Sequence, residues 1–135
     1  MTDEQVLSAF TGWKRADLIF QDFYKVGPSA LGKVDTTFMQ QPFGIYLFLF
    51  HALLFSVLQF LKNNNSIPLS IATDVDSVYE SLGRFRNAIY HLQDDYPSHK
   101  LFEFANLTDS KDKIKRIHSE LGLFLTSSHD KRFAQ

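Results

Sequence analysis

Residues 78–96 read VYESLGRFRNAIYHLQDDY and carry the clearest helical pattern in the chain. The apolar positions alternate in steps of four and three residues and comprise Val78, Leu82, Phe85, Ile89, Leu92 and Tyr96. Because an α-helix has about 3.6 residues per turn, this spacing gives one continuous apolar face. The pattern predicts a long amphipathic helix that begins at a cap supplied by Asp74 or Asp76 and ends before Pro97.

Two further helices are predicted upstream of this segment. The first has Thr2 or Asp3 as its cap and stops at Gly27-Pro28, and a loop follows over residues 29–36. The second opens near Thr37 and ends at the polar cluster of residues 63–66, where turn chemistry outcompetes the helix. The next stretch, residues 67–73, is interpreted as loop, because a single short extended piece makes no sheet.

The C-terminal third predicts a short helix over residues 98–105 and a last helix capped by Thr108 or Asp109. The apolar residues expected to face inward are Ile114, Ile117, Leu121, Phe124 and Leu125. The basic residues expected to face outward are Lys111, Lys113, Lys115 and Arg116. Together the segments predict an all-α, four- to five-helix up-and-down bundle that forms a single domain over residues 1–135.

Residues 42–61, PFGIYLFLFHALLFSVLQFL, contain no formal charge and reach the nominal length of a membrane span. The polar side chains of His51, Ser56 and Gln59 within the stretch favour a helix buried in a bundle instead. A membrane-attached helix is the alternative. The acidic start of the chain lacks the basic region of a signal peptide, so we expect a cytoplasmic protein.

Composition excludes several classes of function. The chain has 135 residues, a formal net charge of -1 and no cysteine. The length indicates one globular domain, and the net charge indicates that it has no broad basic surface for nucleic acid. The absence of cysteine excludes thiol catalysis and cysteine-bound metals. The sequence has no P-loop, dinucleotide-binding GxGxxG, EF-hand or HExxH motif, and its histidines include no pair at helical spacing, so neither a cofactor nor a metal is expected. His51 is interpreted as a core residue.

The candidate site is the segment from Arg84 to His91, which places two guanidinium groups, an amide and an imidazole within two helical turns. Arginine grips phosphate oxygens with a planar fork, and histidine transfers protons near neutral pH. This pairing suits phosphodiester cleavage. His91 would take a proton from a ribose 2′-hydroxyl or give one to the leaving oxygen, while Arg86 would stabilise charge on the phosphorus oxygens.

The run Arg86-Asn87-Ala88-Ile89-Tyr90-His91 is similar to the RxxxxH motif of HEPN domains, including the polar residue that often follows the arginine. HEPN domains are helical bundles of about this size with the motif late in a long helix. The resemblance implies a metal-independent endoribonuclease that works as a homodimer. By this match Arg86 and His91 are catalytic and Asn87 supports them.

The resemblance also implies a place in a toxin–antitoxin, abortive-infection or other defence system, with an antitoxin or a nucleotidyltransferase as partner. Arg84 and Lys100 are then expected to bind RNA phosphates. On a straight helix Arg84 and Asn87 share the face of His91, whereas Arg86 lies about 140° from His91. The alternative is a non-catalytic helical interaction module that binds a partner protein or a nucleotide, with the arginines paired to nearby carboxylates such as Glu80.

Overall fold

The computed structural model describes residues 1–26, 42–90 and 108–133 of the chain. Within these residues it forms four α-helices and one 3-10 turn, and none of them lies in a strand. The elements are α1 (Asp3–Val26), α3 (Pro42–Asn63), η2 (Leu69–Ile71), α4 (Ala72–Tyr90) and α6 (Thr108–Phe133). The expected loop over residues 29–36, the expected start of the second helix near Thr37 and the expected short helix over residues 98–105 lie outside the described residues.

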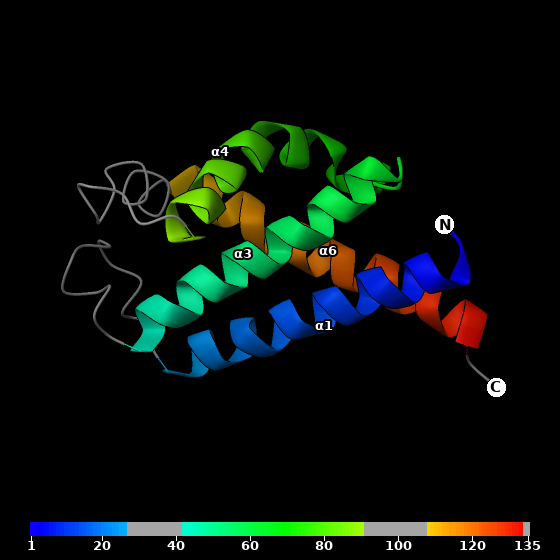
Figure 1. Cartoon of the computed structure of the whole chain (residues 1–135), viewed down its shortest axis with the longest axis horizontal. Helices are drawn as coiled ribbons and strands as arrows, with labels where there is room; N and C mark the ends of the chain where they lie inside the picture. Colours follow the sequence, from blue (N-terminus) through cyan, green and yellow to red (C-terminus); the bar gives the residue numbers. More distant parts are fainter. Residues whose placement is uncertain (27–41, 91–107, 134–135) are drawn as a thin grey trace.

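The four helices run in alternating directions along the long axis of the molecule (Figure 1). Helix α1 packs against α3 and α6, and α4 packs against the same two helices from the other side. The prediction of an all-α helical bundle is therefore confirmed. No helix in the described ranges, α3 included, combines the length and the apolarity that crossing a membrane requires.

The core lies where the four helices meet. Its largest fully enclosed side chains, among the described residues, are Val6, Leu54, Leu58, Leu61, Ile71, Val75, Leu82, Phe85, Ile117, Leu121 and Leu125. Helix α3 contributes many of them because neighbours contact it on two sides, which accounts for its apolar sequence, in which Lys62 of the last turn is the one formally charged residue. On α1 the stripe is narrower, and two of its leucines, Leu7 and Leu18, face outward at 47% and 67% exposure.

Two helix ends follow from side-chain and turn chemistry. At the start of α1, the backbone N–H of Gln5 donates to Thr2 Oγ1 at 3.1 Å, and the backbone N–H of Thr2 donates to Gln5 Oε1 at 2.8 Å. This reciprocal pair is a capping box. After α3, Asn65 adopts φ 51°, and the Ser66 N–H donates to the Leu61 carbonyl at 2.8 Å, which closes the helix as a left-handed cap.

The expected start of α4 at a cap from Asp74 or Asp76 is wrong. The 3-10 turn of residues 69–71 leads directly into α4, which begins at Ala72. Asp74 therefore lies inside the first helical turn, where a negative charge is favourable. Its carboxylate accepts two hydrogen bonds from the Arg116 guanidinium on α6, both at 3.1 Å.

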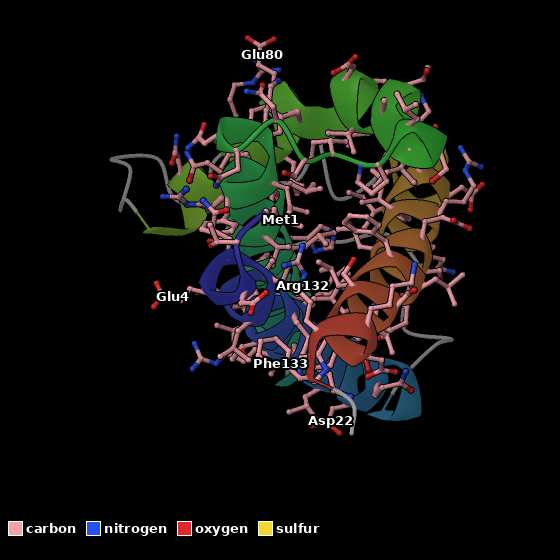
Figure 2. All side chains as sticks on the ribbon, turned by 90° about the vertical axis from the view of Figure 1, so that its right-hand side faces the viewer. Met1, Glu4, Asp22, Glu80, Arg132 and Phe133 are labelled. Atoms are coloured by element: carbon pink, nitrogen blue, oxygen red, sulfur yellow. The ribbon has the colours of Figure 1, made fainter. Side chains whose placement is uncertain are left out.

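The beginning of α1 meets the end of α6, as the labels of Met1, Arg132 and Phe133 show in Figure 2. The guanidinium of Arg132 donates to Asp3 Oδ1 at 2.7 Å. One turn further in, the ring of Phe10 stacks on His129 with centroids 4.3 Å apart. These contacts fix α1 and α6 as antiparallel neighbours, which places Trp13 beside Gly122 and Asp17 beside His118.

Candidate functional site

The motif segment lies in the last two described turns of α4. Arg84 is exposed, and its Nη1 lies 3.4 Å from Glu80 Oε1, an ion pair one helical turn apart. The Glu80 side chain projects outward from the bundle (Figure 2) and is 88% exposed. Asn87, three residues after Arg84, is exposed as well. Arg84 and Asn87 thus share a solvent-facing side of α4.

Arg86 points in a different direction from these two residues. It is half-buried, and its guanidinium carbon lies 5.2 Å from the ring centroid of Phe55 on α3. A guanidinium at this distance from an aromatic face is attracted by the ring quadrupole. The contact holds the Arg86 side chain against the α3–α4 boundary. Arg86 thus lies on a different side of α4 from Arg84 and Asn87, as straight-helix geometry indicates.

The remaining predicted site residues, His91 and Lys100, lie outside the described residues, since the description of α4 ends at Tyr90. The structure therefore brings Arg84 and Asn87 to one side of the end of α4 and places Arg86 on another side of it. The sequence also drew attention to His51, on α3. Its side chain is 8% exposed, and its ring packs edge to face against the ring of Phe85, with centroids 5.2 Å apart. His51 is thus a core residue.

A second cluster, which the sequence did not single out, joins α1 to α6. His118 on α6 is 3% exposed, and its Nε2 lies 2.9 Å from Oδ1 of Asp17 on α1. The imidazole stacks on Trp13, with ring centroids 5.0 Å apart, and packs in a tilted arrangement against Phe20, with ring centroids 4.7 Å apart. Trp13 and Phe20 flank Asp17 by one turn on either side, so one face of α1 encloses the imidazole.

The hydrogen bond to Asp17 indicates which ring nitrogen of His118 carries a proton. A carboxylate only accepts hydrogen bonds, so Nε2 carries the proton donated to Asp17. Within the described residues Nδ1 is buried and has no hydrogen-bond partner. Burial lowers the pKa of the His118 imidazole below its ordinary value of 6.5, and the hydrogen bond and charge of Asp17 oppose this shift in part. The lowered pKa favours the neutral form of the imidazole at neutral pH. The enclosed Nδ1 lacks the access that a general base needs.

The lowered pKa of His118 makes stability depend on pH. The unfolded chain binds a proton near pH 6.5, while the folded chain resists it to a lower pH. The contribution of His118 is therefore complete above pH 6.5 and is lost as the pH falls toward the pKa of the folded state. We expect the Tm to drop between pH 7.5 and 5, and to drop less in His118→Gln, which cannot titrate there.

An NMR titration of the ring protons supplies a direct measurement of the same effect. The His118 signals should keep the shifts of a neutral imidazole at pH values where an exposed histidine is already charged. Titration of His118 at or above pH 6.5, or equal pH slopes of Tm in the two proteins, would contradict the prediction.

A groove of about 640 Å³ runs beside the α1–α6 contact. The residues that line it are Trp13, Asp17, Phe20, Gln21, His118, Ser119, Gly122, Leu123, Thr126, Ser127 and Asp130. Its volume is within the range of small-molecule sites. Among the residues of the described ranges, no three histidine, aspartate or glutamate side chains gather as metal ligands would.

The chain has no detected relatives in three comparisons. No protein-family model matches it, and no curated protein or solved structure is significantly similar to it. The function proposed below is therefore inferred from the residues of this chain.

Proposed function

We propose that the protein binds single-stranded RNA and cleaves it without a metal ion, using the HEPN-like segment from Arg86 to His91. The observation that carries the proposal is this segment, RNAIYH, whose first five residues, 86–90, end the described part of α4 in an all-α bundle. The proposed reaction is attack of a ribose 2′-oxygen on the adjacent phosphorus. The bond from phosphorus to the 5′-oxygen breaks, leaving a 2′,3′-cyclic phosphate on one fragment and a hydroxyl on the other.

Each residue has a defined role in this scheme. His91 removes the proton from the 2′-hydroxyl or supplies one to the 5′-oxygen. Arg86 stabilises the negative charge that builds on the phosphorus oxygens, and Asn87 supports it with hydrogen bonds. Arg84 and Lys100 bind neighbouring phosphates as positive charges.

The contacts of the arginines support these roles. The pair of Arg84 and Glu80 is exposed on both sides, at 55% and 88%, and such pairs add little stability. A phosphate can therefore replace Glu80 at small cost and gain a bidentate contact. Arg86 is already held over Phe55, so less side-chain freedom is lost when it meets a phosphate.

The assembly and setting follow from the same proposal. We propose a homodimer that joins two copies of the segment across one cleft, which would bring a second guanidinium to each phosphate. The proposed setting is a cytoplasmic toxin–antitoxin or other defence system, in which an antitoxin or a nucleotidyltransferase covers or modifies the site.

An RNA cleavage assay tests the proposal directly. Purified protein should cut a single-stranded RNA in the presence of EDTA and leave cyclic phosphate ends, while a DNA of the same sequence stays intact because it lacks the 2′-hydroxyl. His91→Ala and Arg86→Ala should each lower the rate by about 100-fold or more. Arg116→Ala is the matched control, since it removes a surface arginine paired to a carboxylate elsewhere on the bundle.

The outcomes separate the proposal from its alternative. Full cleavage by His91→Ala would exclude His91 as the catalyst. The second candidate is a non-catalytic module that binds a partner protein or a nucleotide, and the packing of Arg86 over Phe55 favours it, because buried arginine stems also serve structure alone. Binding of RNA or of a partner with no cleavage at any protein concentration would select that candidate.

A further inference from the structure

The α1–α6 groove has one carboxylate near each end. Asp17 lies at the level of His118, to which it is hydrogen-bonded. Asp130 lies twelve residues further along α6, a rise of about 18 Å at the spacing of an α-helix. The residues of α6 that line the groove therefore span about three helical turns between these two levels. The carboxylate Oδ1 of Asp130 lies 3.4 Å from Nδ1 of its neighbour His129.

The charge of Asp17 is poorly compensated. Its side chain is 25% exposed and its partner His118 is the neutral imidazole described above. Within the described residues only Oδ1 of Asp17 makes hydrogen bonds, with His118 and, at 3.5 Å, with the Gln21 amide. None of the residues that line the groove is a lysine or an arginine. A partly buried carboxylate without a cationic partner favours a cation in the groove.

The middle of the groove has a different character from its ends. Trp13 is half-buried there, and the neighbouring Leu123 is 68% exposed. The hydroxyl groups of Thr126 and Ser127 add hydrogen-bond acceptors between the two carboxylates. Along the groove, the carboxylate of Asp17 is thus followed by the aromatic and apolar surface of Trp13 and Leu123, with hydroxyl groups beside it, and then by the carboxylate of Asp130.

We propose that this groove binds a linear polyamine, an extended aliphatic chain with ammonium groups at both ends. One terminal ammonium pairs with Asp17 and the other with Asp130, while the methylene chain lies along Trp13 and Leu123. Inner amines donate to the hydroxyls of Thr126 and Ser127. The aromatic face of Trp13 adds attraction for a cation that passes over it.

Other classes of ligand fit less well. A divalent metal needs several ligands around one point, whereas Asp17 and Asp130 lie at levels of α6, those of His118 and Asp130, that are separated by a rise of about 18 Å. A phosphate-bearing ligand would be repelled by both carboxylates. The polyamine site is therefore distinct from the RNA site proposed on α4, and either proposal can fail without the other.

Fluorescence of Trp13 reports on the groove, because it is the only tryptophan in the chain. We would titrate the full-length protein with spermine, with 1,3-diaminopropane and with 1,10-decanediol, all at one ionic strength. Spermine should give a saturable change and bind several-fold more tightly than the short diamine, which cannot reach both carboxylates. The neutral diol should give no saturable change.

Two variants make the test specific. Asp130→Asn removes an exposed charge and should weaken spermine binding by about two- to fivefold, the range of an exposed ion pair, while affinity for the short diamine changes little. Asp112→Asn removes an exposed carboxylate of α6 outside the groove and should leave both affinities unchanged. The proposal is overturned if spermine and NaCl act alike at equal ionic strength, if the diol binds, or if both variants weaken spermine equally.

Discussion

Phe85→Ala is expected to lower the free energy of unfolding by about 3–5 kcal/mol, the cost of removing a large side chain from a packed core. Phe85 is 1% exposed, and its ring packs against two rings of α3, with centroid distances of 5.7 Å to Phe48 and 5.2 Å to His51. A domain of this kind is stable by roughly 5–15 kcal/mol, so this loss is a large part of the total. Urea denaturation followed by circular dichroism measures it.

Phe85→Leu is the matched control for this substitution. It keeps most of the buried volume and should cost less than about 1.5 kcal/mol. A free energy of unfolding of Phe85→Ala within about 1 kcal/mol of that of the parent protein would mean that the ring is not enclosed as described, because many ordinary substitutions cost that much. The same measurement is needed as a control for the RNA assay, because Arg86 directly follows Phe85 and its substitution could also disturb the fold. Only a variant that keeps its fold tests catalysis.

Periodicity predicted most of the fold. The inward stripe of Ile114, Ile117, Leu121 and Leu125 on α6 is buried as expected, because the 3.6-residue repeat alone determines which side chains share a face. The start of α4 was predicted three or five residues late, since an aspartate inside the first turn and an aspartate at the cap have the same local sequence signature. Tertiary contact with Arg116 distinguishes them, and local sequence does not contain it.

The His118 cluster could not be predicted from local pattern. Asp17 and His118 are 101 residues apart in the chain, so their contact depends on how α1 and α6 align. Two signals were present in the sequence. Trp13, Asp17 and Phe20 lie on one face of α1 at steps of four and three, and Gly122 interrupts an otherwise good helix. An aromatic stripe with a carboxylate in it needs a polar partner on a neighbouring helix, and a helical glycine often marks close packing.

The candidate RNA site was predictable only as a motif. Arg86 and His91 are five residues apart, and the resemblance to HEPN domains assigns them one task. A straight helix instead groups Arg84 with Asn87, and the described geometry has these two exposed and Arg86 turned toward α3. Catalysis by Arg86 therefore requires that the phosphate approach at the α3–α4 boundary, beside Phe55. Because of this requirement, Arg86→Ala tests the proposed catalytic site more directly than Arg84→Ala does.

Gly122→Val is expected to destabilise the bundle by about 3 kcal/mol, because no side chain fits between α6 and Trp13. A Cβ placed on Gly122 would lie 2.4 Å from Cζ2 and 2.8 Å from Cη2 of the indole. The ring cannot move aside freely, since its Nε1 donates to the His118 carbonyl at 2.9 Å and its face stacks on the imidazole. The higher helix propensity of valine would stabilise the protein by only a few tenths of a kcal/mol. The steric cost is larger, so the net effect of the substitution is destabilising.

Thermal unfolding and Trp13 fluorescence measure the two consequences together. The Tm should fall by about 10 °C, and the emission should shift to the red as the indole leaves its enclosed position. Glu120→Val, an exposed position two residues away on the same helix, should stay within about 0.5 kcal/mol of the parent protein. If Gly122→Val matched Glu120→Val in both measurements, the close contact of α1 with α6 would be wrong, and the enclosure of His118 and the polyamine groove beside it would lose their structural basis.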